Sequence, residues 1–286
     1  MKVTMRQRLP DAARHRSQLL PDPRIFSLLG KCAEDKVHSG PILAQAKRLE
    51  HTTAVLFPDH TFTDWQEADT VGWQHQQYIM HKSALHTPWA TKDPKLMFRG
   101  SSMTGNRAIA ATFEATDLVD VQVWDWVQEP THDQFVGLPD HCKSKYLLNW
   151  PGNSYSARLK YLLLCGSVVV HSDNGWYEFY YPMLKHGQNF MKTRALAEMG
   201  DFANGLTTLV RHLSTNPKRS RLIAEAGQQF ATDVLSPQNI REYWYRLLKA
   251  YSQLQTFRVH LCNDAIPLGD SLAHPQYVSA EHRTGC

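Results

Sequence analysis

The 286-residue chain is poor in cysteine and lacks the cysteine spacings of zinc-binding or disulfide-rich domains. Its five cysteines are Cys32, Cys142, Cys165, Cys262 and Cys286, and no two of them form a Cys-x-x-Cys pair. An odd count at these spacings argues against a structural zinc site and against a dense disulfide scaffold. One or two disulfides remain open, so cysteine usage does not fix the compartment in which the protein works.

The sequence also lacks long hydrophobic runs and recognisable targeting signals. No stretch reaches the roughly 18 apolar residues that a helix needs to span a bilayer. The segment 1–20 is basic and polar without the apolar centre of a signal peptide, and the last residues are not an ER-retention tetrapeptide. The sequence therefore predicts no membrane span and leaves the localisation unknown.

Neither sign of charge is in large excess, since 31 lysines and arginines face 27 aspartates and glutamates. The net charge of +4 suits a small anionic ligand but is too weak to indicate nucleic acid, and RNP, KH and dsRBD patterns are missing. The basic run 218–221 is typical of a solvated helix face. The spacing of His75, His81 and His86 does not place them on one helical face, so we expect no metal site.

Two phosphate-binding signatures are missing as well. The sequence contains no Gly-x-Gly-x-x-Gly loop and no Walker lysine, which disfavours a dinucleotide-binding or NTPase function. What remains is an ordinary globular composition, 42% hydrophobic and 20% charged, in a chain long enough for one large domain or two small ones.

The clearest pattern that is present is a β-α-β unit over residues 145–171. We expect a strand over 146–150, a turn over 151–153, a helix over 155–165 that ends at Gly166, and a second strand over 167–170. Such a unit predicts an α/β fold with parallel strands.

Hydrophobic spacing predicts further elements on both sides of this unit. Strands are expected over 24–29, 54–57, 96–98 and 119–123. Helices are expected over 41–50 and 72–84, and after the Asn216-Pro217 and Ser236-Pro237 cap signals. The connector 87–95, which contains two prolines, is a soft domain boundary.

A candidate anion-binding site lies at the turn of the β-α-β unit. A helix that begins at 154–156 would offer unpaired backbone N–H groups and a partial positive charge. Ser154 and Ser156 add hydroxyl donors, and Arg158 can bind two phosphate oxygens. These groups lie beyond the carboxyl end of a strand, where open α/β sheets bind ligands. The alternative is an ordinary helix start with Ser154 as its cap.

Two other segments are candidate ligand contacts. Arg99, Gly100 and Ser101 follow a strand, and the glycine lets a ligand approach closely. The alternative is a surface arginine at a tight turn. The aromatic segment 176–182 could stack on a base or a sugar, with Glu178 binding ribose hydroxyls. Its alternative is a packed aromatic core in which Glu178 starts a helix.

Five segments in the same order resemble the CAP10-type glycosyltransferases of glycosyltransferase family 90, which includes the rumi-like protein O-glucosyltransferases. The segments are 98–101, 140–149, 153–167, 176–185 and 224–227. The resemblance is good over 94–256 and weak over 21–75. It implies an α/β, GT-B-like architecture of two Rossmann-like domains, in which the donor domain is complete here and the N-terminal domain is partial.

The resemblance also implies a division of the chain. Residues 1–90 would be a partial N-terminal acceptor-side domain, 91–235 the nucleotide-sugar-binding domain, 236–258 a C-terminal crossover helix and 259–286 a tail. The short first domain leaves open that the chain lacks an N-terminal half-domain.

The implied activity is an inverting, metal-independent transfer of glucose or xylose from UDP-glucose or UDP-xylose to a hydroxyl of a protein or glycan, without a cofactor. Arg158 would offset the charge that builds on the departing UDP. The implied secretory-pathway setting is the lumen of the endoplasmic reticulum or Golgi. By position, the donor would contact Arg99, Gly100, Ser101, Asn153, Ser154, Tyr155, Ser156, Ala157, Arg158 and Glu178.

An inverting transfer needs a base that deprotonates the acceptor hydroxyl. The resemblance places this catalytic base at Asp11, in a Leu-Pro-Asp setting, and Asp22 is the nearest rival. Either residue can instead be a turn aspartate. A chain without the base would be a catalytically inactive nucleotide-sugar-binding relative. The two functions differ in whether a carboxylate faces the donor sugar.

Overall fold

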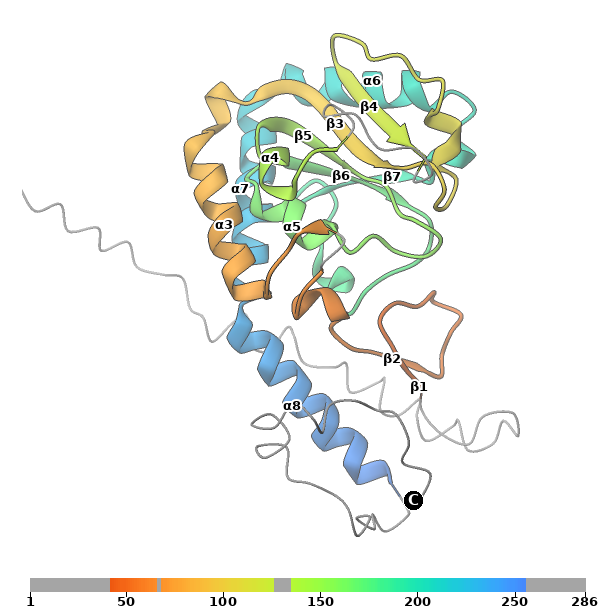
Figure 1. Ribbon diagram of the computed structural model, residues 1–286, viewed down its shortest axis with the longest axis vertical. Coiled ribbons are helices and arrows are strands. Elements are labelled where there is room, and N and C mark those ends of the chain that lie inside the picture. Colours follow the sequence, from red (N-terminus) through yellow and green to blue (C-terminus); the bar gives the residue numbers. More distant parts are fainter. Residues whose placement is uncertain (1–41, 66–67, 126–134, 256–286) are drawn as a thin grey trace, which may run out of the picture. The chain divides into compact units, whose positions relative to one another are not determined.

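The structure is a computed structural model that describes residues 42–65, 68–125 and 135–255 (Figure 1). The chain divides into two compact units, Met1–Leu247 and Leu248–Cys286. The described part of the second unit is the end of helix α8 (Pro237–Leu254) and Gln255. The fold and the site below belong to the first unit. The strand expected over 24–29 and the candidate base Asp11 lie outside the described residues.

A five-stranded sheet forms the centre of the first unit, and all of its pairings are parallel. The strand order is β4-β3-β5-β6-β7, which confirms the expected α/β fold with parallel strands. The strands are β3 (Asp93–Ser101), β4 (Val119–Trp124), β5 (Ser144–Asn149), β6 (Val168–Asp173) and β7 (Met191–Arg194).

A separate parallel pair, β1 (Ile42–Ala44) and β2 (Ala54–Leu56), precedes the large sheet. The helix expected over 41–50 is therefore wrong. The backbone of this segment is used in strand pairing, because Ile42 N–H donates to the Thr53 carbonyl and the Ala44 carbonyl accepts from Phe57 N–H. Tertiary pairing overrides the helical spacing of the apolar residues here.

Six α-helices are found among the described residues: α3 (Trp73–His86), α4 (Leu138–His141), α5 (Leu159–Leu164), α6 (Phe202–Thr215), α7 (Pro217–Asp233) and α8. The cap expected at Asn216 is confirmed, since its side-chain oxygen accepts from Arg219 N–H at 3.1 Å. Short 3₁₀ turns include η2 (His60–Phe62) and η5 (Arg107–Ala110). No helix in the described parts of the chain is long and apolar enough to cross a membrane.

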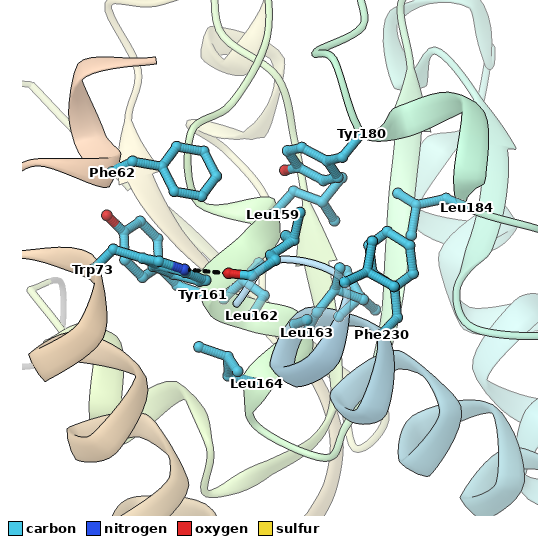
Figure 2. Packing of buried hydrophobic residues seen from close by; sticks show 14 of the residues in the cluster. Phe62, Trp73, Leu159, Tyr161, Leu162, Leu163, Leu164, Tyr180, Leu184 and Phe230 are labelled. Atoms are coloured by element: carbon cyan, nitrogen blue, oxygen red, sulfur yellow. Dashed lines mark hydrogen bonds between the residues drawn. The ribbon is translucent and has the colours of Figure 1, made fainter. Parts of the chain in front are cut away.

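Each face of the sheet carries its own hydrophobic core, because successive strand residues point to opposite faces. Met97, Leu147 and Val169 face a core that includes residues of α3, α5 and the end of α7 (Figure 2). Their neighbours Phe98 and Leu148 face a second core built with α6 and the start of α7. Strands covered on both faces are typical of parallel sheets, and they fix where the strand ends and their loops lie.

Helix α5 begins later than expected, which changes the character of the candidate anion site. A helix over 155–165 was predicted, but α5 spans only Leu159–Leu164. The carbonyls of Ser154 and Tyr155 are already bonded, to the Asn174 side chain at 2.6 Å and to Gly152 N–H at 3.2 Å. These bonds hold 152–158 as a loop. Gly166 ends the helix with φ +60, as expected.

A disulfide joins Cys142, just after α4, to Cys165, just after α5. Lys92 donates to the backbone carbonyls of both cysteines, and the bond to Cys165 measures 3.0 Å. The disulfide closes a 23-residue separation that contains β5 and α5. The ends of α4 and α5 are thereby tied to each other covalently.

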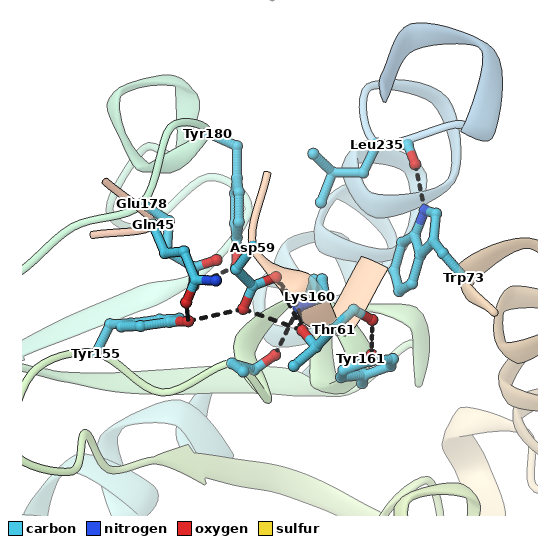
Figure 3. A network of polar contacts seen from close by, with 11 residues as sticks. Gln45, Asp59, Thr61, Trp73, Tyr155, Lys160, Tyr161, Glu178, Tyr180 and Leu235 are labelled. Atoms are coloured by element: carbon cyan, nitrogen blue, oxygen red, sulfur yellow. Dashed lines mark hydrogen bonds and ion pairs between the residues drawn. The ribbon is translucent and has the colours of Figure 1, made fainter. Parts of the chain in front are cut away.

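A buried polar network joins the segment after β2 to α5 (Figure 3). Lys160 and Asp59 form an ion pair at 3.2 Å, and both side chains are fully buried. Asp59 also accepts from the Thr61 hydroxyl at 2.9 Å and from the Tyr155 hydroxyl at 2.9 Å. Lys160 donates further to the Thr61 hydroxyl and to the Ala157 carbonyl. Through its bonds to Tyr155 and Ala157, the network therefore holds the loop 152–158 in place.

Glu178 lies at the edge of this network and is also fully buried. Its Oε1 accepts from the Tyr180 hydroxyl at 3.2 Å, and its Oε2 has no hydrogen-bond partner among the described residues. Burial, with the negative charge of Asp59 as a second cause, raises the pKa of the Glu178 carboxyl well above its usual range. Burial therefore favours the neutral form of this carboxyl, and Glu178 is a structural acid of the buried network.

Lys160→Met should strongly destabilise the protein, because it leaves the Asp59 carboxylate buried without its counter-charge. We expect a loss of about 3–5 kcal/mol in the free energy of unfolding, measured with urea. The double variant Asp59→Asn with Lys160→Met should recover part of that loss. Lys192→Met is the matched control: its pair with Asp173 is half exposed and should be worth less than about 1 kcal/mol. If the stability losses of the single variants Lys160→Met and Asp59→Asn simply added up in the double variant, the two side chains would not be coupled, which would contradict the buried ion pair.

Glu178→Gln should flatten the pH dependence of stability. The pKa of Glu178 is raised on folding, so the folded state binds a proton that the unfolded state releases above about pH 4.3. The contribution of this group to stability therefore falls as pH rises from there toward the folded-state pKa. Glutamine keeps an acceptor for Tyr180 but cannot ionise. Urea melts between about pH 5 and 8 should slope less for the variant, whereas the exposed control Glu198→Gln should keep the wild-type slope.

Candidate active site

A cavity of about 350 Å³ lies where the carboxyl ends of β3, β4 and β5 meet. Its walls come from the segment 99–107 after and within β3, from Trp124 at the end of β4, and from the loop 152–158 after β5. Residues 135–141, Trp65 and Ala68 complete the described lining. The carboxyl edge of a parallel sheet is where α/β proteins bind ligands.

The cavity brings together two groups of residues that the sequence singled out separately. Arg99, Gly100 and Ser101 lie on one wall, and Tyr155, Ser156, Ala157 and Arg158 lie on another. The two groups are more than fifty residues apart in the chain. Their meeting follows from the pairing of β3 with β5.

Three other expected contacts do not line this cavity. Asn153 lines a different cavity, and its Oδ1 accepts from Gly105 N–H at 2.7 Å. Ser154 is outside the lining and uses its carbonyl to hold Asn174. Glu178 is fully buried beneath the loop, so it offers no surface to a ribose here. The anion site expected at the N-terminus of a helix over 154–156 is not formed, because 152–158 is a loop and α5 begins only at Leu159.

Arg158 is the residue of the expected set that best suits an anion. Its Nη1 donates to the Arg99 carbonyl, and its guanidinium lies 4.8 Å from the centre of the Phe98 ring. Its Nη2 is buried and has no hydrogen-bond partner among the described residues. Burial lowers the pKa of Arg158. A negatively charged ligand would satisfy the free Nη2 donor and offset the cost of burying the charge.

Arg107 is a second cationic wall residue, and the sequence reasoning missed it. It donates from Nη2 to the Trp150 carbonyl at 2.6 Å and from Nε to the Pro151 carbonyl at 3.2 Å. Its guanidinium lies 5.4 Å from the centre of the Phe98 ring. Burial lowers the pKa of Arg107, and the charge of Arg158 lowers it further. The available signal was a second arginine in the polar segment that follows Arg99.

Arg99 plays a different part, because its charge is already paired. It forms an ion pair with Asp120 at 2.7 Å and also donates to the Phe98 and Asp120 carbonyls. Its own carbonyl holds Arg158. Arg99 therefore shapes the wall and positions Arg158. The positive charge that the cavity offers to a ligand comes mainly from Arg158 and Arg107.

The segment 135–141 adds apolar surface and one neutral histidine to the cavity lining. Phe135, Val136 and Leu138 supply the apolar surface, and His141 lies in the same segment. Burial lowers the pKa of His141 to about 4, so the ring is uncharged near neutral pH. Its Nδ1 lies 3.0 Å from the Gly137 carbonyl, which can only accept, so Nδ1 carries the proton. The buried Nε2, which has no partner among the described residues, is then an acceptor.

The described lining residues include three arginines and no aspartate or glutamate. The cavity therefore combines an electropositive end, where Arg107 and Arg158 lie beside Phe98, with the apolar surface and the neutral histidine acceptor of segment 135–141. Such a site can bind a small molecule that carries both an anionic group and a flat, polar ring.

Curated relatives of this chain are protein O-glucosyltransferases. Protein O-glucosyltransferase 1 of Bos taurus is 30% identical over 272 residues, which cover 88% of this chain and 65% of that protein. O-glucosyltransferase rumi of Drosophila melanogaster is 28% identical over 247 residues, which cover 80% of this chain and 59% of that protein. The chain thus spans less than two-thirds of the length of these relatives.

Solved structures show only a distant likeness. Anabaena Alr3699/HepE in complex with UDP-glucose is 13% identical with a TM-score of 0.36, covering 80% of this chain and 55% of that one. Sucrose-phosphate synthase from Thermosynechococcus elongatus is 11% identical with a TM-score of 0.40, covering 88% of this chain and 65% of that one. Likeness at this level adds nothing to the description of the site.

The family resemblance of the five sequence segments is confirmed by a match to the family as a whole. The sequence pattern of Glycosyl transferase family 90 matches residues 28–279, which include every described residue of the cavity wall. This chain belongs to glycosyl transferase family 90.

Proposed function

We propose that this protein transfers glucose or xylose from UDP-glucose or UDP-xylose to a hydroxyl of a protein or glycan. The observation that carries the proposal is the pair of uncompensated guanidinium groups, Arg107 and Arg158, at one end of the cavity. Family membership and the names of the curated relatives support a sugar-transferring activity.

The diphosphate of UDP fits the electropositive end. Arg158 offers its free Nη2, and Arg107 lies beside the same Phe98 ring. The hydroxyls of Ser101 and Ser156 are further donors on the two walls. Charge-assisted bonds of this kind are about twice as strong as neutral ones. We therefore assign the phosphate contacts mainly to two arginine side chains.

The uridine fits the apolar surface of segment 135–141. Uracil is flat and largely apolar on its faces, which suits the surfaces of Val136, Leu138 and Phe135. The uracil N3–H is a donor, and His141 Nε2 is a neutral acceptor in the same segment. This assignment orients the sugar of the donor away from residues 135–141.

The chemistry that we infer is a direct, inverting displacement. A base takes the proton of the acceptor hydroxyl, the oxygen forms a bond to the anomeric carbon, and the bond from that carbon to UDP breaks. Negative charge builds on the departing diphosphate, where Arg107 and Arg158 stabilise it. These fixed cations supply the positive charge without a divalent metal.

The base remains the open part of the proposal. Asp11 is our candidate and lies outside the described residues. No described lining residue of the cavity is a carboxylate. The alternative function is therefore that of a relative that binds a nucleotide sugar without catalysis. Replacing Asp11 by Asn distinguishes the two, because only an active enzyme has a transfer rate to lose.

The disulfide supports a place in the secretory pathway. Cys142–Cys165 links the end of α4 to the end of α5, and disulfides persist in oxidising compartments such as the endoplasmic reticulum lumen. We therefore infer that the chain acts on acceptors in that lumen. The division into an acceptor-side domain over 1–90 and a donor domain over 91–235 likewise stays a prediction.

Arg158→Ala should weaken UDP binding at least tenfold, or about 1.4 kcal/mol, because it removes the free charged donor from the phosphate end. Titration calorimetry of UDP against both proteins measures this. Arg221→Ala is the matched control, since Arg221 is exposed and pairs with Glu225 on α7, far in sequence from the cavity wall. Equal UDP affinity for wild type and Arg158→Ala would defeat the assignment.

Turnover of the donor should not need a divalent cation, because the arginines carry the charge of the leaving group. In the presence of EDTA, UDP release from UDP-glucose or UDP-xylose, followed by chromatography, should stay within about twofold of the untreated rate. Activity that EDTA abolishes and manganese restores would contradict the metal-independent mechanism.

A further inference from the structure

A second cavity of about 300 Å³ adjoins the first. Gly152 lines both cavities, Thr104 lines the first and Gly105 lines the second. The two loops touch through their glycines: a Cβ on Gly105 would lie 2.7 Å from the Gly152 carbonyl oxygen. The two cavities are therefore neighbours that meet where these two loops touch.

The second cavity differs from the first in its charge. Its described lining contains no aspartate or glutamate, and its one charged residue, Arg48, is paired with Glu50 at 2.7 Å. The remaining polar groups are neutral, and they include the amides of Asn106, Asn153 and Asn174. A ligand for this cavity needs hydrogen-bonding groups but no charge.

The amide groups are held in fixed orientations. Asn153 Oδ1 accepts from Gly105 N–H at 2.7 Å, and Asn106 Oδ1 accepts from the Trp150 indole N–H at 3.0 Å. With their oxygens engaged in this way, both side chains present their NH₂ groups as donors. Hydroxyl oxygens are natural acceptors for such donors. Pre-oriented amides lose little entropy when they bind a ligand.

Trp176 supplies an aromatic surface to the same cavity. Its ring packs edge-to-face against His51, with the ring centres 5.5 Å apart, and its backbone N–H donates to Asn174 Oδ1 at 3.2 Å. The indole is therefore fixed by its neighbours. A pyranose ring has an apolar C–H face that packs on an aromatic ring, while its hydroxyls point to the rim.

We propose that this second cavity binds a neutral hexopyranose or pentopyranose unit of the acceptor. Its described lining has no unpaired charge to bind a diphosphate, which suits a neutral sugar ring better than a nucleotide sugar. The proposal rests on the proposed function for the role of this sugar as an acceptor. It makes the acceptor a saccharide, and it places acceptor and donor in neighbouring cavities that share Gly152.

The test is binding of methyl glucopyranoside and methyl xylopyranoside to the full chain, by ligand-observed NMR titration with and without UDP. We expect at least one glycoside to bind at millimolar concentration and to remain bound when UDP is added. Trp176→Ala should weaken glycoside binding at least tenfold and leave the Kd for UDP unchanged. Trp176→Phe keeps a smaller stacking surface and should lose less.

Arg158→Ala provides the reverse comparison, with UDP binding lost and glycoside binding retained. Wild type that binds a glycoside but not UDP would defeat the proposed function and leave the saccharide site standing. The saccharide site is overturned if neither glycoside binds, if UDP displaces the bound glycoside, or if Trp176→Ala weakens UDP as much as glycoside. Should Trp176→Ala melt at a lower temperature than wild type, the folded Trp176→Phe variant decides between these outcomes.

Discussion

The site depends on two guanidinium groups held beside one aromatic ring. Arg107 and Arg158 both lie against Phe98, and their positions are set by carbonyls at the ends of β3 and β5. Like charges this close repel each other, so the arrangement needs fixed acceptors and an aromatic face. Gly100 makes room for it, because a Cβ there would lie 2.8 Å from the Phe98 ring and 3.3 Å from Arg107 Nη1. The positive charge of the cavity therefore comes from arginine side chains held in fixed positions, and not from the N-terminus of a helix.

A buried network supports that arrangement from the other side of the loop. Tyr155 lines the cavity, and its hydroxyl donates to Asp59, which also neutralises Lys160. Because Asp59 follows β2 while Lys160 lies in α5, the small β1–β2 pair and the large sheet share one polar centre. The geometry of the cavity wall therefore depends on residues that are a hundred positions away in the sequence.

The sequence predicts the strands of this fold better than its loops. Alternating or continuous apolar runs found β3 to β6, because strands covered on both faces leave a strong signal. The sequence also pointed to Arg99 and Arg158 as candidate ligand contacts, but it did not show that the two segments line the same cavity. The start of α5 and the strand β1 were wrong, because carbonyls and N–H groups there bond to distant partners such as Asn174 and Thr53. Arg107 and Glu178 were misjudged because burial, which decides their roles, is not a local property.

The glycine contact between the two loops sets a limit on how this site can change. Gly105 has φ +62, and both it and Gly152 lie too close to the opposite loop for a side chain, since a Cβ on Gly152 would lie 2.7 Å from Thr104 Oγ1. A substitution at either position would push the two loops apart and so change the walls of both cavities together. At this contact the two cavities therefore cannot be resized independently of each other.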